Sequence, residues 1–199
     1  YLDDLWGGHL ATGDKDMALP FKAPEGAYAI DQDGADYGFL VIPDHWRRLL
    51  WQGGIRPLEE ACWRGVPERC DTYWLLGVPQ ETVKAGTRAG SVQKQTLVTR
   101  VEPISKEEAP ECLWRPFPLF YGQLPDRFDG VDGEISSIKG MSGGPIFGVN
   151  TLDENTCRYW VTHIQSCWHR PSRVISACPV EYFADIVDRA IREINASTS

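Results

Sequence analysis

The amino-acid sequence predicts an all-β domain of the barrel type with one α-helix near its C-terminal end. Most apolar residues fall in short runs of strand length, separated by Gly, Pro, Asn and Asp, which is typical of antiparallel β-proteins. Residues 179–195 differ, because their apolar side chains recur every three or four positions, as in an amphipathic helix. Many short strands with one closing helix favour a barrel over a parallel sheet, which needs a helix between successive strands.

The first part of the chain has few regular elements. Residues 1–27 are rich in Gly, Asp, Pro and Lys and are expected to be mainly loop. Residues 31–36 have turn chemistry, and residues 37–42 form an apolar run that predicts a buried strand. Residues 44–52 are expected to form a short helix with an aspartate N-cap, followed by a second helical turn near residues 56–60.

Strand patterns dominate from residue 72 onward. Residues 92–102 alternate apolar and polar side chains, which predicts a half-exposed strand. Residues 113–121 contain prolines, so we expect an irregular edge strand there at best. Asp153-Glu154-Asn155 predicts a hairpin-like turn. The other expected strands are residues 72–76, 145–149, 159–165 and 173–178.

The composition argues against two classes of partner. The chain has 199 residues, with 20 Lys and Arg against 28 Asp and Glu, and a net charge of −8. Its basic residues form no stripe, so we expect no nucleic acid held through phosphate contacts. The longest apolar runs are only strand length, so the sequence predicts no membrane span.

The six cysteines indicate reduced thiols. They contain no Cys-x-x-Cys pair, so we expect no zinc site, and the sequence suggests no other metal or cofactor. Three disulfides are formally possible, but a domain of this size does not need them, and several cysteines lie in apolar, strand-like contexts. We therefore expect an intracellular, cytoplasmic protein.

The strongest chemical signal is the run Gly-Met-Ser-Gly-Gly-Pro at residues 140–145. Acyl transfer by serine needs a hydroxyl on a tight turn whose backbone a substrate can approach closely, and glycines permit such a turn. The N–H groups of Gly140 and Ser142 would form an oxyanion hole. A glycine-rich turn with a capping serine is the alternative, but the apolar strand that follows directly favours a nucleophile.

The run Gly-Met-Ser-Gly-Gly-Pro-Ile-Phe resembles the nucleophile motif of the trypsin-like (chymotrypsin-clan) serine peptidases, in the version common in bacteria. The resemblance implies two packed six-stranded antiparallel β-barrels. Residues 1–85 would be the remainder of an incomplete first barrel, 86–178 the second barrel, and 179–195 the C-terminal helix. Met141 departs from the animal enzymes, which carry aspartate there, so activation by a freed N-terminal amine is not expected.

The resemblance also implies a catalytic acid. Asp36, followed by a short apolar strand, fits the family pattern and would orient the histidine and stabilise its imidazolium form. The alternative is that Asp36 merely ends a turn. Residues 73–79, Tyr-Trp-Leu-Leu-Gly-Val-Pro, resemble the strand and Gly-x-Pro turn that these bacterial peptidases carry between acid and nucleophile.

No histidine in the chain fits the position of the general base well. His9 lacks the apolar strand that normally leads into the catalytic histidine, and His45 follows Asp36 too closely. His163 and His169 come after the nucleophile, which breaks the His, Asp, Ser order of the clan. The chain starts at Tyr1 without methionine or a signal sequence. We therefore expect the catalytic histidine upstream of Tyr1, with His9 as the alternative.

The resemblance places the specificity pocket near Ser136, about six residues before the nucleophile, with the strand at residues 162–166 as one wall. Ser136 is not acidic, so a trypsin-like preference for Lys or Arg is not expected. His163 and Gln165 would suit a polar or acidic substrate side chain. Alternation along the strand would equally allow one of them to be buried without a role.

Two functions remain open at this point. The first is a serine endopeptidase that hydrolyses polypeptides through an acyl-enzyme on Ser142, as one module of a larger protein with other domains or subunits. The second is a catalytically inactive trypsin-like scaffold that serves as a protein-binding or regulatory module. Both accommodate Ser142 and Asp36, and a histidine within hydrogen-bonding reach of Ser142 separates them.

Overall fold

The computed structural model describes residues 9–11, 18–20, 42, 44–52, 54–85, 92–130 and 133–197. The chain divides into two compact units, and each is described by itself. One unit comprises residues 1–30 and 38–58, and the other comprises residues 31–37 and 59–199.

The smaller unit contains a short hairpin and a helix. Strand β1 (His9–Ala11) pairs antiparallel with β2 (Ala18–Pro20), and α2 spans Asp44–Gln52. The helix expected over residues 44–52 is therefore confirmed with the same bounds. The strand expected over residues 37–42 lies outside the described residues, apart from Ile42.

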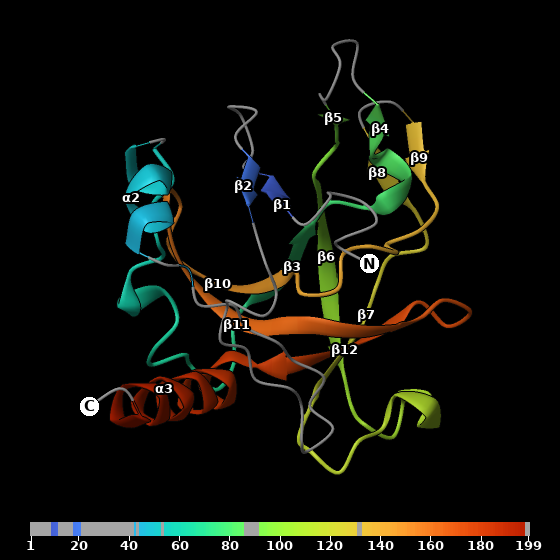
Figure 1. The fold of residues 1–199 in the computed structure, drawn as a ribbon. Coiled ribbons are helices and arrows are strands. Elements are labelled where there is room, and N and C mark those ends of the chain that lie inside the picture. Colours follow the sequence, from blue (N-terminus) through green and yellow to red (C-terminus); the bar gives the residue numbers. More distant parts are fainter. Residues whose placement is uncertain are drawn as a thin grey trace. The chain divides into compact units, whose positions relative to one another are not determined.

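The larger unit is built on a closed six-stranded antiparallel barrel (Figure 1). Each strand pairs with the next in the order below, and the last pairs with the first. The strands are β3 (Thr72–Gly77), β6 (Leu97–Ile104), β7 (Phe120–Gln123), β12 (Val174–Pro179), β11 (Thr156–His169) and β10 (Pro145–Asp153). The expected all-β architecture is confirmed in this form, with one closed barrel. The described residues do not form a second barrel.

The alternation of buried and exposed residues expected over residues 92–102 is confirmed in β6, which begins only at Leu97. Leu97, Thr99 and Val101 are buried, whereas Val98 and the Arg100–Glu102 ion pair face outward. The first residues of the expected strand instead form β5 (Val92–Gln93), which pairs with β4 (Lys84–Ala85). Three residues between β5 and β6 break the alternation, so one long strand becomes two short ones.

Strand β7 differs from the irregular edge strand expected over residues 113–121. A single 3₁₀ turn, η4 (Glu111–Leu113), is followed by irregular chain, and β7 begins only after Pro116 and Pro118. Proline lacks the N–H needed for a strand ladder, which explains the late start. Once formed, β7 is an interior strand between β6 and β12, so the expectation of an edge position was wrong.

The barrel also includes β3, although the family resemblance implies that residues 1–85 belong to a first barrel and residues 86–178 to a second. The other elements of this unit are short: η2 (Glu60–Cys62), η3 (Gln80–Thr82) and the hairpin of β8 (Phe128–Gly130) with β9 (Gly133–Ile135). The turn expected at residues 153–155 does join β10 to β11.

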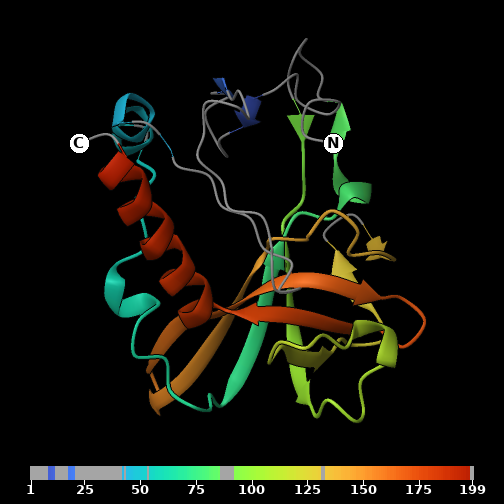
Figure 2. The same cartoon turned by 60° about the horizontal axis from the view of Figure 1, so that its bottom comes forward.

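Helix α3 (Val180–Ser197) continues directly from β12 (Figure 2). It confirms the helix expected over residues 179–195, starting one residue later and ending two residues later. The ring of Tyr182 packs on Phe117, with ring centroids 3.9 Å apart. The helix therefore contacts the irregular chain that precedes β7.

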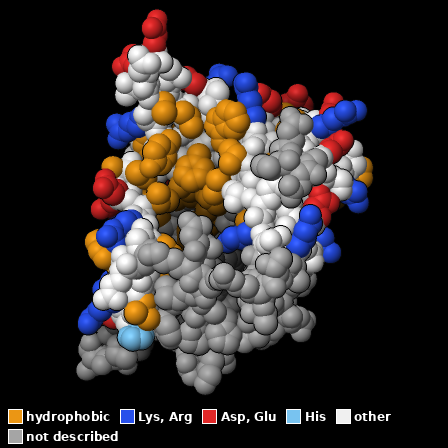
Figure 3. Space-filling model, turned by 90° about the horizontal axis from the view of Figure 1, so that it is seen from above, with side chains coloured by type: hydrophobic (Ala, Val, Ile, Leu, Met, Phe, Trp, Pro, Cys, Tyr) orange, Lys and Arg blue, Asp and Glu red, His pale blue; other side chains and the backbone are white. Residues whose placement is uncertain are grey.

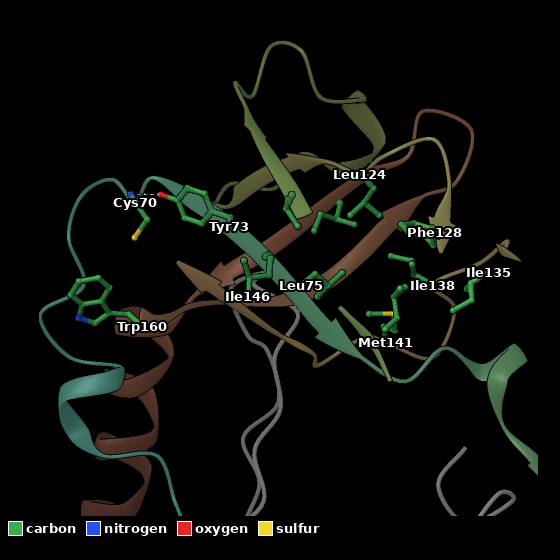
Figure 4. Packing of buried hydrophobic residues seen from close by; sticks show 14 residues of the cluster. Cys70, Tyr73, Leu75, Leu124, Phe128, Ile135, Ile138, Met141, Ile146 and Trp160 are labelled. Carbon is green, nitrogen blue, oxygen red and sulfur yellow. Dashed lines mark hydrogen bonds between the residues drawn. The ribbon is translucent and has the colours of Figure 1, made fainter. Parts of the chain in front are cut away.

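The barrel interior holds the main hydrophobic core (Figure 4). Its members come from the barrel strands, from the chain between β7 and β10, and from the residues just before β3. They are Cys70, Tyr73, Leu75, Leu97, Val101, Leu124, Phe128, Ile135, Ile138, Met141, Ile146, Trp160, Ile175 and Ala177. The core therefore links the strands to the segment that carries residues 140–145.

The face of the molecule drawn in Figure 3 carries both apolar and charged side chains. Figure 3 shows hydrophobic side chains gathered on one face, with Lys, Arg, Asp and Glu around them. Within the described residues, no helix has both the length and the apolar character needed to cross a membrane.

We expect Leu75→Ala to lower the free energy of unfolding by about 2–5 kcal/mol, because Leu75 is fully buried between strands that close the barrel. Urea denaturation measures this loss. The control is Val98→Ala on the outer face of β6, where 55% of the residue is exposed and the expected cost is below about 1 kcal/mol. Equal losses at the two positions would contradict the barrel interior described above.

Candidate functional site

Ser142 lies on a double turn between β9 and β10. The N–H of Met141 donates to the carbonyl of Ile138 (3.0 Å), and the N–H of Gly144 donates to the carbonyl of Met141 (2.8 Å). The chain therefore reverses twice within a few residues, and Ser142 occupies the second turn. Both turns use backbone groups alone, so the path of the loop does not depend on the serine side chain.

Two backbone hydrogen bonds join this turn to β11. The N–H of Gly143 donates to the carbonyl of Gln165 (2.8 Å), and the N–H of Gln165 donates to the carbonyl of Gly144 (2.9 Å). A Cβ atom on Gly144 would lie 2.6 Å from the Leu76 carbonyl oxygen, closer than side chains approach. Glycine at position 144 thus allows the turn to lie directly against β3.

Met141 anchors the loop in the core. Its side chain is only 1% exposed and belongs to the same cluster as Ile138 (Figure 4). It packs over Gly77 of β3, where a Cβ atom would lie 2.8 Å from the Met141 methyl carbon. Met141 is therefore a hydrophobic anchor of the loop.

The Ser142 side chain faces outward, since the residue is exposed. Its hydroxyl donates to the carbonyl of Ser166 (3.2 Å). Ser166 is buried, and its own hydroxyl donates to the carbonyl of Ser176 (3.3 Å). The nucleophile candidate is thus held beside the register shift between Gln165 and Cys167 in the β11–β12 pair.

The two N–H groups expected to form an oxyanion hole belong to exposed residues. Neither Gly140 nor Ser142 donates its N–H to another residue of the described chain. Gly140 has a φ of +93°, a conformation that favours glycine. It also packs closely on Gln80, whose N–H donates to the carbonyl of Lys139 (2.7 Å). The backbone is therefore fixed on both sides of these two donors.

Ser136 is bound by Glu81, a residue that the sequence analysis did not identify. The Glu81 carboxylate accepts hydrogen bonds from the Ser136 N–H (2.5 Å), the Ser136 hydroxyl (2.8 Å) and the Ser137 N–H (3.1 Å). Burial raises the pKa of Glu81, but these hydrogen bonds and the charge of Arg170 outweigh it, so the pKa lies below its ordinary value. The Ser136 hydroxyl, placed by resemblance at the pocket floor, is thus already used as a donor.

His163 lies among aromatic rings in the barrel. Its ring centroid is 4.3 Å from that of Phe120 and 6.4 Å from that of Tyr73. The single hydroxyl proton of Thr162 goes to the Ile146 carbonyl, so His163 Nδ1 is the donor in its 2.9 Å hydrogen bond to Thr162. Burial lowers the pKa of His163 to about 4, which keeps the imidazole neutral at pH 7.

Gln165 is also buried, with 2% of its surface exposed. Its backbone binds the Ser142 turn, whereas its side-chain Oε1 has no hydrogen-bond partner among the described residues. The alternative that alternation along the strand buries one of the two residues therefore applies to Gln165, whereas His163 is partly buried. Their part in substrate binding stays a prediction.

The expected acid and the other three histidines are not brought to Ser142 by the described residues. Asp36, the expected acid, lies outside the described residues. His9 lies on β1 in the smaller unit, and its side chain is not described. His45 is exposed on α2, and His169 bonds to the Ser172 hydroxyl (2.7 Å).

The structure thus joins Gly140, Ser142 and the Gln165 backbone in one site, with Ser136 on the same loop. It adds Glu81, which is 55 residues from Ser136 along the chain, so no local sequence signal could identify their contact. The described part of the chain contains no group of three or more His, Cys, Asp or Glu side chains suited to hold a metal ion.

We expect the protein to lose stability in acid through His163. Below pH 6.5 the unfolded chain binds a proton that the folded ring does not accept until about pH 4. The free energy of unfolding should therefore fall by about 2–3 kcal/mol between pH 7 and pH 4.5 from this residue alone. Urea denaturation at both pH values measures the loss, which should be smaller in His163→Gln.

The control for this experiment is His45→Gln, because His45 is exposed on α2. This variant should retain the acid loss of the unmodified protein. If His163→Gln loses as much stability in acid as the unmodified protein does, the His163 ring is not buried in its neutral form.

No family model, curated protein or solved structure matches this chain, so the functional assignment rests on the geometry around Ser142.

Proposed function

We propose that the chain is the nucleophile-bearing part of a trypsin-like serine endopeptidase. The observation that supports this most directly is an exposed serine, Ser142, on a turn held by β3 and β11. The N–H groups of Ser142 and of the exposed Gly140 donate to no other described residue. Acyl transfer needs this combination, because the donors must already face the developing oxyanion when the reaction begins.

In the proposed reaction, a general base removes the Ser142 hydroxyl proton while Oγ attacks the carbonyl carbon of a peptide bond. The carbonyl oxygen becomes an oxyanion that accepts hydrogen bonds from the N–H groups of Gly140 and Ser142. The protonated base then donates its proton to the leaving amine, and the acyl-enzyme remains on Ser142. Water, activated by the same base, releases the acid product and restores the hydroxyl.

The base is a histidine oriented by Asp36 in this proposal. The barrel histidines are poor candidates, because His163 lies among aromatic rings and His169 is bonded to Ser172. The proposal therefore retains the two sources given by the sequence, His9 and a histidine upstream of Tyr1.

The substrate class is a polypeptide, and other domains or subunits of a larger protein are the further expected partners. A cytoplasmic location is also part of the proposal. It is supported by the cysteines, all six of which are described and none of which forms a disulfide with another. Burial raises the pKa of the Cys70 thiol, consistent with a small hydrophobic side chain in the core.

The alternative function is an inactive scaffold that binds protein partners. The engagement of His163 and His169 by other side chains is the observation that favours it. Covalent labelling of Ser142 separates the two functions, because a scaffold without a base does not activate the hydroxyl.

We expect a fluorophosphonate probe to label the native polypeptide that contains this chain, and Ser142→Ala to abolish the labelling. The serine contributes little to packing, so the variant should keep its circular dichroism spectrum and unfolding midpoint. The matched control is Ser137→Ala, a serine of the same loop whose hydroxyl accepts the Lys139 N–H. This variant should still be labelled.

Labelling that persists in Ser142→Ala would place the reactive residue elsewhere. An unlabelled native polypeptide would favour the scaffold function instead. The variant His9→Ala distinguishes the two sources of the base: retained labelling assigns the base to a histidine upstream of Tyr1, whereas loss of labelling assigns it to His9.

A further inference from the structure

Glu81 joins two parts of the chain that are far apart in sequence. It lies in η3, directly after β3, whereas its partners Ser136 and Ser137 begin the loop that leads to Ser142. Its neighbour Gln80 holds the other end of the same segment through the Lys139 carbonyl. Two consecutive residues therefore fix both ends of residues 136–139.

The segment held in this way leads directly into the expected oxyanion hole. Lys139 precedes Gly140, whose positive φ turns the chain toward Met141 and Ser142. Met141 is fixed in the core and Gly143 is fixed on β11, so the side of the turn toward β10 is already constrained. On the opposite side, residues 136–139 make no contact in the β10–β11 ladder. Ile138 is buried in the core, whereas the exposed start of this segment at Ser136 is held by Glu81.

We infer that Glu81 is a positioning residue, whose carboxylate holds residues 136–139 so that the Gly140 N–H stays directed at the reaction centre. This inference rests on the proposed peptidase function. Glu81 does not itself touch the reacting atoms, and its effect passes through the backbone of Ser136 and Ser137.

The two carboxylate oxygens of Glu81 accept hydrogen bonds from different donors. Oε1 accepts both backbone N–H groups, from Ser136 and Ser137, whereas Oε2 accepts the Ser136 hydroxyl. A glutamine side chain keeps an acceptor equivalent to Oε1 and presents an NH₂ group to a hydroxyl that can also accept. The substitution Glu81→Gln can therefore retain the contacts, whereas Glu81→Ala removes all three.

The groups around Glu81 stabilise the ionised form of its carboxyl group. Desolvation raises the pKa of the carboxyl group, but the hydrogen bonds from Ser136 and Ser137 and the positive charge of Arg170, in the turn after β11, outweigh it and lower the pKa. The carboxylate is consequently ionised at neutral pH, which strengthens the hydrogen bonds that it accepts.

The first test is amide hydrogen exchange on the intact protein, with no substrate required. Glu81→Ala should speed exchange of the Ser136 and Ser137 amides by about 10- to 100-fold, since each loses a hydrogen bond to a charged acceptor. Glu81→Gln should restore most of the protection. The matched control is Glu134→Ala, because Glu134 is an exposed carboxylate on β9 in the stem of the same loop.

The second test is the rate of fluorophosphonate labelling of the native polypeptide, separated into probe affinity and the maximal rate of bond formation. The maximal rate should fall about 10-fold in Glu81→Ala and recover in Glu81→Gln. This is less than the roughly 100- to 1000-fold cost of removing an oxyanion-hole donor, because the Gly140 N–H stays present and is only less firmly positioned. Ser136→Ala, which removes only the contact to Oε2, should have a smaller effect. Glu134→Ala should leave the rate unchanged.

Unchanged exchange in Glu81→Ala would overturn the inference, as would faster exchange with an unchanged labelling rate. Equal loss in Glu81→Ala and Glu81→Gln would overturn it too, because the effect would then come from charge and not from the contacts. If the unmodified protein is not labelled at all, the proposed function fails and the positioning role fails with it. The exchange data would still decide whether Glu81 holds the loop.

Discussion

The structure around Ser142 depends on two backbone hydrogen bonds between the serine-bearing turn and β11. The Gly143 N–H binds the Gln165 carbonyl, and the Gln165 N–H binds the Gly144 carbonyl. Because β11 is paired along its length with β10 and β12, this contact transmits the rigidity of the barrel to an exposed turn. A hydroxyl on a flexible loop would lose the fixed geometry that acyl transfer requires. The turn that carries Ser142 is instead fixed against the barrel wall while the serine stays exposed.

The rest of the loop is arranged to support this contact. Met141 fills the space over Gly77, so the residue before the serine is fixed by the core while the serine itself faces solvent. On the other side, Gln80 and Glu81 hold the chain that leads to Gly140. The hydrophobic core, the strand ladder and a surface carboxylate therefore constrain three successive parts of one loop. Each contact joins residues that are distant in the sequence.

The parts of the fold that local patterns encode were predictable. The helix at Asp44–Gln52, the helix after β12 and the turn between β10 and β11 follow from periodicity and turn chemistry. Pairing was not predictable, because it depends on distant partners: β7 lies between β6 and β12 in the barrel although the prolines that precede it favour an edge. Ser142 could be identified as a candidate nucleophile because the glycines around it predict a tight turn. No such local pattern identifies Glu81, and the burial of His163 against Phe120 appears only once β7 and the barrel are assembled.

The central claim is that Ser142 forms the covalent intermediate, and an acyl-enzyme trapped from a true acyl donor tests it most directly. The native polypeptide is mixed with an activated peptide ester, quenched in acid and digested, and the acylated peptide is sequenced by mass spectrometry. The account predicts a burst of about one equivalent of alcohol per active site and an acyl group on Ser142. A burst with the acyl group on another residue, or turnover without any covalent intermediate, would contradict it.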